Sequence, residues 1–258
     1  MKIVVLVKEV PDTYGEREID PETGLANRAA SESVMDEINE RALEVALRYA
    51  DANPETEVVV LSLAPETATA TIRKGLAMGA SRAVHVADDA LVGADYGVTG
   101  EVIAAALRRI GYDLVVAGNL STDGSGGIIP AMVAELLGVP HATALSSVSI
   151  TENEVTGQRS SDAGIMQMSA PLPAVISITD RLPDARFPNF KGIMAAKKKP
   201  LEVLNLADLG VELSESAVPH SIMVSVSERP PRAAGVKILD EGDAGKKLAD
   251  FLAQNRLV

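Results

Sequence analysis

The sequence predicts an α/β fold, a doubly wound and mostly parallel sheet with β-additions and a C-terminal arm. Runs of strand length alternate with segments of helical periodicity over the first two-thirds of the chain, which is typical of parallel sheets. The first run, KIVVLV, is apolar throughout, as a strand buried on both faces is. A change of rhythm after about Gly138 indicates the β-additions.

The strand–helix alternation can be followed in order along the chain. Largely apolar runs predict four strands, at residues 2–7, 57–63, 83–88 and 113–118. Apolar residues on one helical face predict helices at 36–49, 68–78 and 97–110, and a fourth helix that ends at Leu137. Pro65 suits a first helical turn and Gly79 can end the helix that follows it.

The last third of the chain has a different pattern. SSVSITENEVTGQR and PAVISITD are strand-like runs separated by turns, and we expect them at the edge of the sheet. From Lys197 onward come KKKP, the strand-like run HSIMVSVSE, the turn RPPRAAG and a polar helix at 244–254. We therefore divide the chain into an α/β domain at 1–200 and an arm at 201–258. The arm is either a peripheral tail or a segment that embraces a partner.

Composition excludes several classes of function. With no cysteine among 258 residues, disulfides, thiolate metal sites and cysteine nucleophiles are ruled out. A net charge of −12 argues against a nucleic-acid partner, because phosphates need a basic face. No apolar run is long enough to span a membrane, and the N-terminus lacks the features of a signal peptide. We therefore expect a cytoplasmic protein with no membrane insertion.

The Gly-rich stretch GNLSTDGSGGIIP joins the fourth strand to the fourth helix. In an open α/β sheet, ligands bind beyond the carboxyl ends of the strands, where backbone N–H groups and a helix N-terminus can hold a phosphate. The stretch can equally be a flexible βα turn with helix caps. Neither a Walker-type GxxxxGK[ST] motif nor a GxGxxG after the first strand is present. Composition and spacing thus predict a site for a nucleotide-sized anion.

No catalytic constellation stands out in the sequence. His85, His141 and His220 are far apart, and none lies beside a candidate nucleophile or metal-ligand set. We interpret His85 as a satisfied core or edge residue. The chain alone is therefore expected not to be an enzyme and to bind no metal.

Five motifs are spread along nearly the whole chain: VLVKEVPD, TIRKGLAMGAS followed by HV, AGNLSTDGSGG, LPAVISITDRLPDARFPNFKGIMAAKKK and PPRAAGVK. Together they resemble the β subunit of electron transfer flavoproteins. The bacterial branch with the STDG loop is the most similar. The resemblance implies a fold of the adenine-nucleotide-binding type, an α subunit that holds most of the FAD, and AMP as a structural ligand of the β subunit.

Site residues are also implied by this resemblance, and Asp36 can serve as a simple N-cap as well. Those expected at the AMP are Leu6, Asp36, Glu37, Ile38, Asn39, Leu63, Gly118, Asn119, Leu120, Ser121, Thr122, Asp123, Gly124, Ser125, Gly126, Gly127, Ile128 and Ile129. Those expected near the flavin are Thr13 and Tyr14.

The resemblance further implies a partner-recognition loop at residues 186–195, with Phe190 at the anchor position. Its contact residues would be Arg186, Phe187, Phe190, Ile193 and Met194. The implied electron donors are flavin dehydrogenases such as the acyl-CoA dehydrogenases of fatty acid oxidation, with a membrane quinone oxidoreductase downstream. Without the resemblance, Phe190 would be read as a core residue. Lys197 to Lys199 are expected to border the α subunit or to steer acidic partners.

The chain departs from the family pattern in places. LPDAR replaces LNEPR, with Pro183 and Ala185 at the changed positions, and Ser160 stands where relatives have an acidic residue. The Gly-rich loop lacks the pattern of the electron-bifurcating branch, in which FAD replaces AMP.

Two other classes of function compete with this interpretation. One is an ATP-handling enzyme, which needs an SGGxDS-like loop after the first strand, and the other is a nucleotide sensor, which would end near residue 140 to 150.

Overall fold

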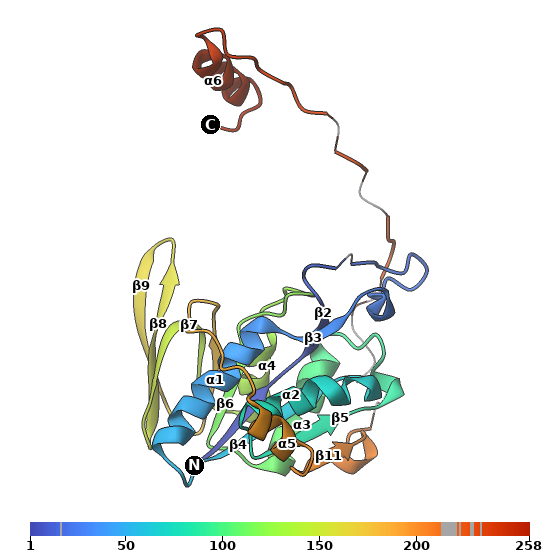
Figure 1. Ribbon diagram of the computed structural model, residues 1–258, viewed down its shortest axis with the longest axis vertical. Coiled ribbons are helices and arrows are strands. Elements are labelled where there is room, and N and C mark those ends of the chain that lie inside the picture. The colour runs from blue at the N-terminus through green and yellow to red at the C-terminus, as the bar shows by residue number, and fades with distance from the viewer. Residues whose placement is uncertain (16, 213–220, 222, 228–229, 233) are drawn as a thin grey trace. The chain divides into compact units, whose positions relative to one another are not determined.

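The computed structural model describes residues 1–15, 17–212, 221, 223–227, 230–232 and 234–258 (Figure 1). It divides into two compact units, Met1–Val224 and Ser225–Val258. Every strand and all helices except the last lie in the first unit. The second unit contains α6 (Ala244–Gln254), which covers the residues that the sequence predicted.

One sheet of nine strands runs through the first unit, with β11 and β9 at its two edges (Figure 1). Its order is β11 (Leu201–Leu204), β5 (Arg82–Val86), β4 (Glu57–Leu63), β1 (Lys2–Leu6), β6 (Leu114–Gly118), β10 (Ala174–Ile178), β7 (His141–Ile150), β8 (Glu154–Ser161) and β9 (Gly164–Pro171). From β11 to β7 every neighbouring pair is parallel, whereas β8 and β9 are antiparallel additions. The predicted fold class is therefore confirmed.

Helices cover both faces of this sheet, so it is doubly wound. Ile3 and Val5 of β1 pack into a core shared with α1 (Glu37–Ala52) and α2 (Thr69–Met78). The alternate residues Val4 and Leu6 pack into a second core with α3 (Tyr96–Ile110) and α4 (Ile129–Leu137). Successive strand side chains point to opposite faces, which explains why a strand between two helical layers is apolar at every position.

One predicted edge strand lies inside the sheet. The run AVISI of PAVISITD forms β10, which pairs in parallel with β6 on one side and β7 on the other. The expectation of an edge position for this run was wrong. All five residues of β10 are buried, so the run has the uniformly apolar character of an interior parallel strand. Strand β9, which the sequence did not predict, forms the edge instead.

One feature of the first unit was not predicted: the segment between β1 and α1 carries a small antiparallel pair, β2 (Glu9–Pro11) and β3 (Ser33–Met35). The strand expected at HSIMVSVSE needs correction. In the run HSIMVSVSE, the described residues 221 and 223–227 form no strand, and the rest, with His220, lies outside the described residues. Strand β11 extends the sheet beyond residue 200.

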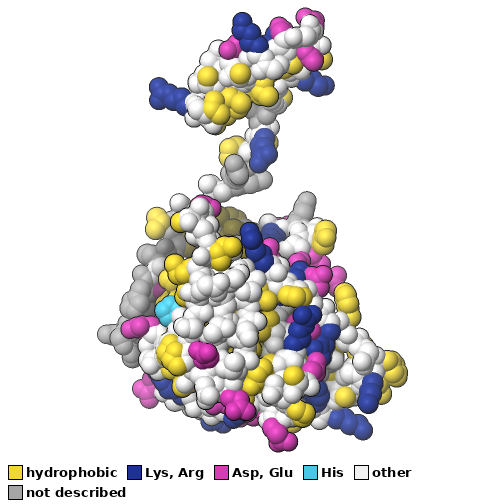
Figure 2. Space-filling model, turned by 90° about the vertical axis from the view of Figure 1, so that its left-hand side faces the viewer, with side chains coloured by type: hydrophobic (Ala, Val, Ile, Leu, Met, Phe, Trp, Pro, Cys, Tyr) yellow, Lys and Arg dark blue, Asp and Glu magenta, His cyan; other side chains and the backbone are white. Residues whose placement is uncertain are grey.

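The outer surface of the first unit is mixed in character. On the face that Figure 2 shows, hydrophobic side chains are interspersed with charged ones. Ile165 and Met166 on β9 are among the exposed apolar residues. Within the described part of the chain, no helix is both long enough and apolar enough to cross a lipid bilayer.

Candidate functional site

A cavity of about 640 Å³ opens at the carboxyl ends of the central strands. The chain runs from β1 to β4 and β5 on one side of β1 and then crosses to β6 on the other side, so the direction of winding reverses at β1. Such a switch point leaves a crevice between the diverging loops, and ligands of open α/β sheets bind there. The volume lies within the range of about 300–1,000 Å³ that is typical of small-molecule sites.

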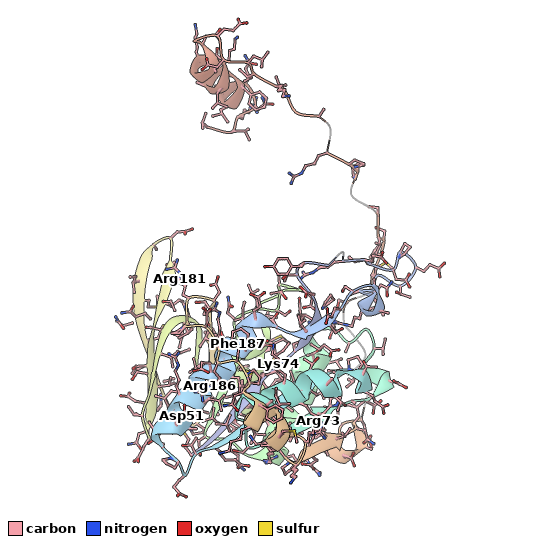
Figure 3. The ribbon with its side chains drawn as sticks, viewed as in Figure 1. Asp51, Arg73, Lys74, Arg181, Arg186 and Phe187 are labelled. Carbon is pink, nitrogen blue, oxygen red and sulfur yellow. The ribbon has the colours of Figure 1, made fainter. Side chains whose placement is uncertain are left out.

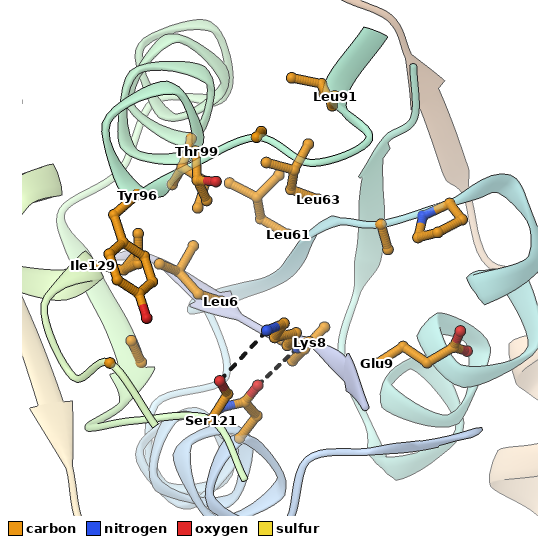
Figure 4. A pocket seen from close by; sticks show the side chains of 18 of the residues that line it. Leu6, Lys8, Glu9, Leu61, Leu63, Leu91, Tyr96, Thr99, Ser121 and Ile129 are labelled. Atoms are coloured by element: carbon orange, nitrogen blue, oxygen red, sulfur yellow. Dashed lines mark hydrogen bonds between the residues drawn. The ribbon is translucent and has the colours of Figure 1, made fainter. Parts of the chain in front are cut away.

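One wall of the cavity is apolar. Leu6, Leu61 and Leu63 lie at the ends of β1 and β4, and Figure 4 shows them near Tyr96 and Thr99 of α3. Aliphatic side chains facing an aromatic ring can enclose a flat heterocycle such as a nucleobase.

The opposite wall is built from the loop that follows β6. Gly126 packs against Tyr96, and a Cβ atom at this position would overlap the tyrosine hydroxyl. Gly127 has a φ of 67°, a conformation that favours glycine. At Gly118 a Cβ atom would lie 2.5 Å from Nδ2 of Asn39. Packing at Gly118 and Gly126 and the backbone conformation at Gly127 thus favour glycine, and all three residues line the cavity.

Asp36 ties this loop to the start of α1. Its carboxylate accepts hydrogen bonds from the backbone N–H of Ile38 at 3.0 Å and from the N–H and hydroxyl of Thr122 at 2.7 and 2.9 Å. Asp36 is fully buried and is outside the cavity lining. The side chain therefore caps the helix and fixes the loop at the same time.

Two basic residues that sequence reasoning missed hold Asp123 of the same loop. Lys8 Nζ lies 2.8 Å from Oδ1 of Asp123, and Arg28 Nη2 lies 3.2 Å from Oδ2. Burial raises the pKa of Asp123, but hydrogen bonds from Lys8 and Ser121 outweigh it and hold the pKa well below its usual range. Lys8 and Arg28 both line the cavity. Lys8 could have been found from its position two residues after β1, because ligands of open α/β sheets bind beyond the carboxyl ends of the strands.

One residue of the cavity lining carries an unpaired polar atom. Oδ1 of Asn119 is buried and has no hydrogen-bond partner within the described chain. The same residue is fixed by its backbone, because its N–H donates to the carbonyl of Ile178 at 2.8 Å. A buried acceptor without a partner costs free energy unless a bound group donates to it. Asn119 Oδ1 is therefore an uncompensated acceptor behind the surface of the cavity.

The cavity brings most of the residues expected at the AMP together. Those that line it are Leu6, Asn39, Leu63, Gly118, Asn119, Leu120, Ser121, Gly126, Gly127, Ile128 and Ile129. Those outside its lining are Asp36, Glu37, Ile38, Thr122, Asp123, Gly124 and Ser125. Thr13 and Tyr14, expected near the flavin, lie outside the lining too, on the segment between β2 and β3, and Tyr14 is 97% exposed.

The segment expected to recognise a partner lies on the α1 and α2 side of the sheet. We call residues 186–195 the recognition segment. Its second half is helical, because α5 (Phe190–Ala196) begins at Phe190 with Asn189 as its N-cap. Four apolar side chains point outward: Phe187 is 91% exposed, Phe190 79%, Ile193 46% and Met194 48%. Arg186 instead directs its guanidinium toward Glu44 and Asp51 of α1.

Two further candidate residues, His85 and Lys199, have structural partners. His85 is buried and its Nε2 lies 2.9 Å from the carbonyl oxygen of Ala64, but its buried Nδ1 has no hydrogen-bond partner among the described residues, so the histidine is only partly satisfied. Lys199 donates to the carbonyls of Leu76 and Ala80 at 3.0 and 2.6 Å, so it ties the chain to α2. Among the residues that the structure describes, no group of His, Asp and Glu could hold a metal ion.

Fold and cavity define the class: an α/β protein with a doubly wound sheet and a nucleotide-sized site at its switch point. Comparison with known proteins identifies the family. The electron transfer flavoprotein domain model matches residues 23–209. The chain is 45% identical over 264 residues to the electron transfer flavoprotein subunit beta of Mycobacterium leprae (strain TN), covering 99% of each chain. It is 32% identical over 243 residues to the caffeyl-CoA reductase-Etf complex subunit CarD of Acetobacterium woodii, covering 93% of this chain and 92% of the relative.

The chain belongs to the electron transfer flavoprotein family, as a β subunit. This is a family of electron carriers. Membership implies FAD as a cofactor and an α subunit as a partner.

Proposed function

We propose that this β subunit pairs with an α subunit in a cytoplasmic heterodimer that accepts electrons from flavin dehydrogenases, such as acyl-CoA dehydrogenases. The electrons pass through FAD held mainly by the α subunit toward the respiratory chain, by way of a membrane quinone oxidoreductase. The observation that carries this proposal is the recognition segment. The first unit exposes two phenylalanines three residues apart, Phe190 at the start of a short helix and Phe187 in the turn before it. Aromatic side chains exposed in this way are typical anchors of protein interfaces.

We assign the cavity to AMP as a structural ligand. Its apolar wall suits the adenine, and the backbone of the Gly126–Gly127 loop suits the phosphate, because it leads into the N-terminus of α4. Lys8 and Arg28 add positive charge, which Asp123 partly neutralises.

The flavin supplies the redox chemistry when it is bound, and this chain contributes binding and orientation. Thr13 and Tyr14 would approach the flavin ring from the β side, and the exposed ring of Tyr14 leaves it free to do so. Of the arm expected at 201–258, the part that forms the second unit, Ser225–Val258, would pack on the α subunit, because β11 belongs to the sheet. Leu248 and Phe251 of α6 are exposed, and an amphipathic helix with such residues buries them on a partner.

Co-expression with a candidate α subunit tests this function. The purified pair should contain one FAD and one AMP, measured by absorption and by chromatography of the denatured protein, and a reduced acyl-CoA dehydrogenase should bleach its flavin. The β chain purified alone should carry little flavin. Two FAD molecules per pair would instead place the protein in the electron-bifurcating branch, and a flavin that no dehydrogenase reduces would contradict the electron-carrier role.

A further inference from the structure

The recognition segment is exposed in its middle but fastened at both ends to the two helices beneath it. On the side before it, Arg41 of α1 donates to the carbonyl of Leu182 and lies 2.5 Å from Oδ1 of Asp184. On the side after it, Arg73 of α2 donates to the carbonyl of Ala196 at 3.0 Å. The segment is thus a bridge between α1 and α2.

The most extensive of these attachments is made by Arg186. Oε2 of Glu44 accepts from the backbone N–H of Arg186 at 3.1 Å and from its Nε at 2.7 Å, and Oε1 accepts from Nη2 at 3.3 Å. The same Nη2 lies 2.7 Å from Oδ2 of Asp51. Glu44, Arg48 and Asp51 follow one another on one face of α1, and Arg48 also pairs with Glu44. Figure 3 shows Arg186 and Asp51 together beside α1, with Phe187 next to Arg186.

This attachment sits where water screens it poorly. The Glu44 side chain is only 6% exposed. Burial alone raises the pKa of Glu44, yet the hydrogen bonds from Arg186 and Arg48 outweigh it and lower the pKa. A forked guanidinium fixes direction as well as charge, because two of its N–H groups and the backbone N–H meet one carboxylate. The orientation of the chain at residue 186 is therefore set immediately before Phe187.

We propose that Arg186 is a positioning residue: with Glu44 and Asp51 it sets the pose of the recognition segment and does not itself contact the dehydrogenase. The inference rests on the proposed docking function of this segment. An apolar loop that is already held in its docking pose loses less conformational freedom on binding, which tightens association without changing the later electron transfer. The guanidinium is committed to α1, while the neighbouring phenylalanine is left for the partner.

The test uses Arg186→Lys in the αβ complex, because lysine keeps the charge but cannot form the fork. The probe is one purified acyl-CoA dehydrogenase, with the αβ complex as its electron acceptor. The KM of this dehydrogenase for the Arg186→Lys complex should be about fivefold higher than for the wild-type complex, and kcat at saturation should stay within a factor of about two. Arg181→Lys is the matched control, because Arg181 lies five residues before Arg186 and is exposed. The KM of the dehydrogenase for this variant complex should equal that for the wild-type complex. FAD and AMP content should be unchanged in both variants.

A double-mutant cycle separates positioning from direct contact. If Arg186 acts through the segment, Arg186→Lys should add almost nothing to KM in a Phe190→Ala background. A full additive effect there would mean that Arg186 touches the dehydrogenase, and it would overturn the inference. A wild-type KM for Arg186→Lys, with a raised KM for Phe190→Ala, would also overturn it while leaving the docking function intact. A wild-type KM for Phe190→Ala would overturn the docking function.

Asp51→Asn provides a milder variant in case Arg186→Lys gives no folded complex. The Asp51 side chain is 62% exposed, so its loss leaves the buried Glu44–Arg186 pair in place. It should raise KM by a smaller factor, about twofold, again only when Phe190 is present. An unchanged KM for this variant would then contradict the positioning role of Arg186.

Discussion

The cavity and the recognition segment both adjoin α1, but the chain holds them in opposite ways. The cavity loop is held by a buried carboxylate that caps the helix and by glycines that allow close packing against Asn39 and Tyr96. The recognition segment is held by ion pairs at its start and by a hydrogen bond from Arg73 just after its end, and the apolar side chains between them remain exposed. A concave site for a small ligand needs backbone at close range. A docking site for a protein needs apolar area that stays uncovered until the partner arrives.

This comparison predicts that a substitution in the loop removes the small ligand and spares docking. Replacing Gly126 and Gly127 with valine should lower bound AMP to background, an effect of about a hundredfold or more. A Cβ atom at position 126 would overlap Tyr96, and a branched side chain at position 127 would be forced into a backbone with positive φ. AMP is measured by chromatography of the denatured complex.

Gly124→Ala is the control for this experiment, because a Cβ atom there meets its neighbours at ordinary distances of 3.7 and 3.9 Å. It should retain AMP. The KM of the dehydrogenase for the complex should be the same for the wild type, the double valine variant and Gly124→Ala, since the recognition segment lies on other elements. Undiminished AMP in the double valine variant would show that the loop is only a turn.

The converse substitution should remove docking and spare the ligand. Phe190→Ala should weaken association with an acyl-CoA dehydrogenase by roughly thirtyfold, since an aromatic anchor contributes about 2 kcal/mol or more. AMP and FAD should stay bound, and dithionite should reduce the flavin normally because it needs no docking surface. Val203→Ala, which shortens an exposed apolar side chain on β11, should have no effect. Loss of flavin or of folded protein in Phe190→Ala would identify Phe190 as a structural residue.

A smaller effect concerns the acid sensitivity of the cavity loop. The pKa of Asp123 is lowered in the folded protein, so the folded state binds fewer protons than the unfolded chain, in which aspartate has a pKa of about 3.9. The stabilisation by Lys8 and Arg28 is therefore complete above that pKa and is lost as the pH falls through the lower folded value. Asp123→Asn should lower the free energy of unfolding by about 1–3 kcal/mol at pH 7.

The difference between wild type and Asp123→Asn should shrink as the pH is lowered toward 3, measured by urea unfolding of the complex. Asp162→Asn, at the exposed tip of the β8–β9 hairpin, is the control and should match the wild type at every pH. A difference that stays constant from pH 7 to pH 3 would show that Asp123 is not held by its basic neighbours.

Much of the fold could be predicted because it depends on local patterns. Uniformly apolar strand runs and the spacing of apolar residues in the helices indicated a doubly wound parallel sheet, and α6 was placed correctly at both ends. The position of β10 could not be predicted, since strand order depends on which edges pair across long loops. A run such as AVISI has the same local character at any interior position.

The site divides in the same way. The sequence by itself determined that a Gly-rich loop follows the strand that becomes β6 and that aromatic residues stand in a polar stretch near residue 190. Only the tertiary structure decided the partners. Asp123 meets Lys8 and Arg28 across 115 and 95 residues of chain, and Arg186 meets Glu44 across 142. Contacts of that separation arise from the packing of elements around the sheet, and no local periodicity records them.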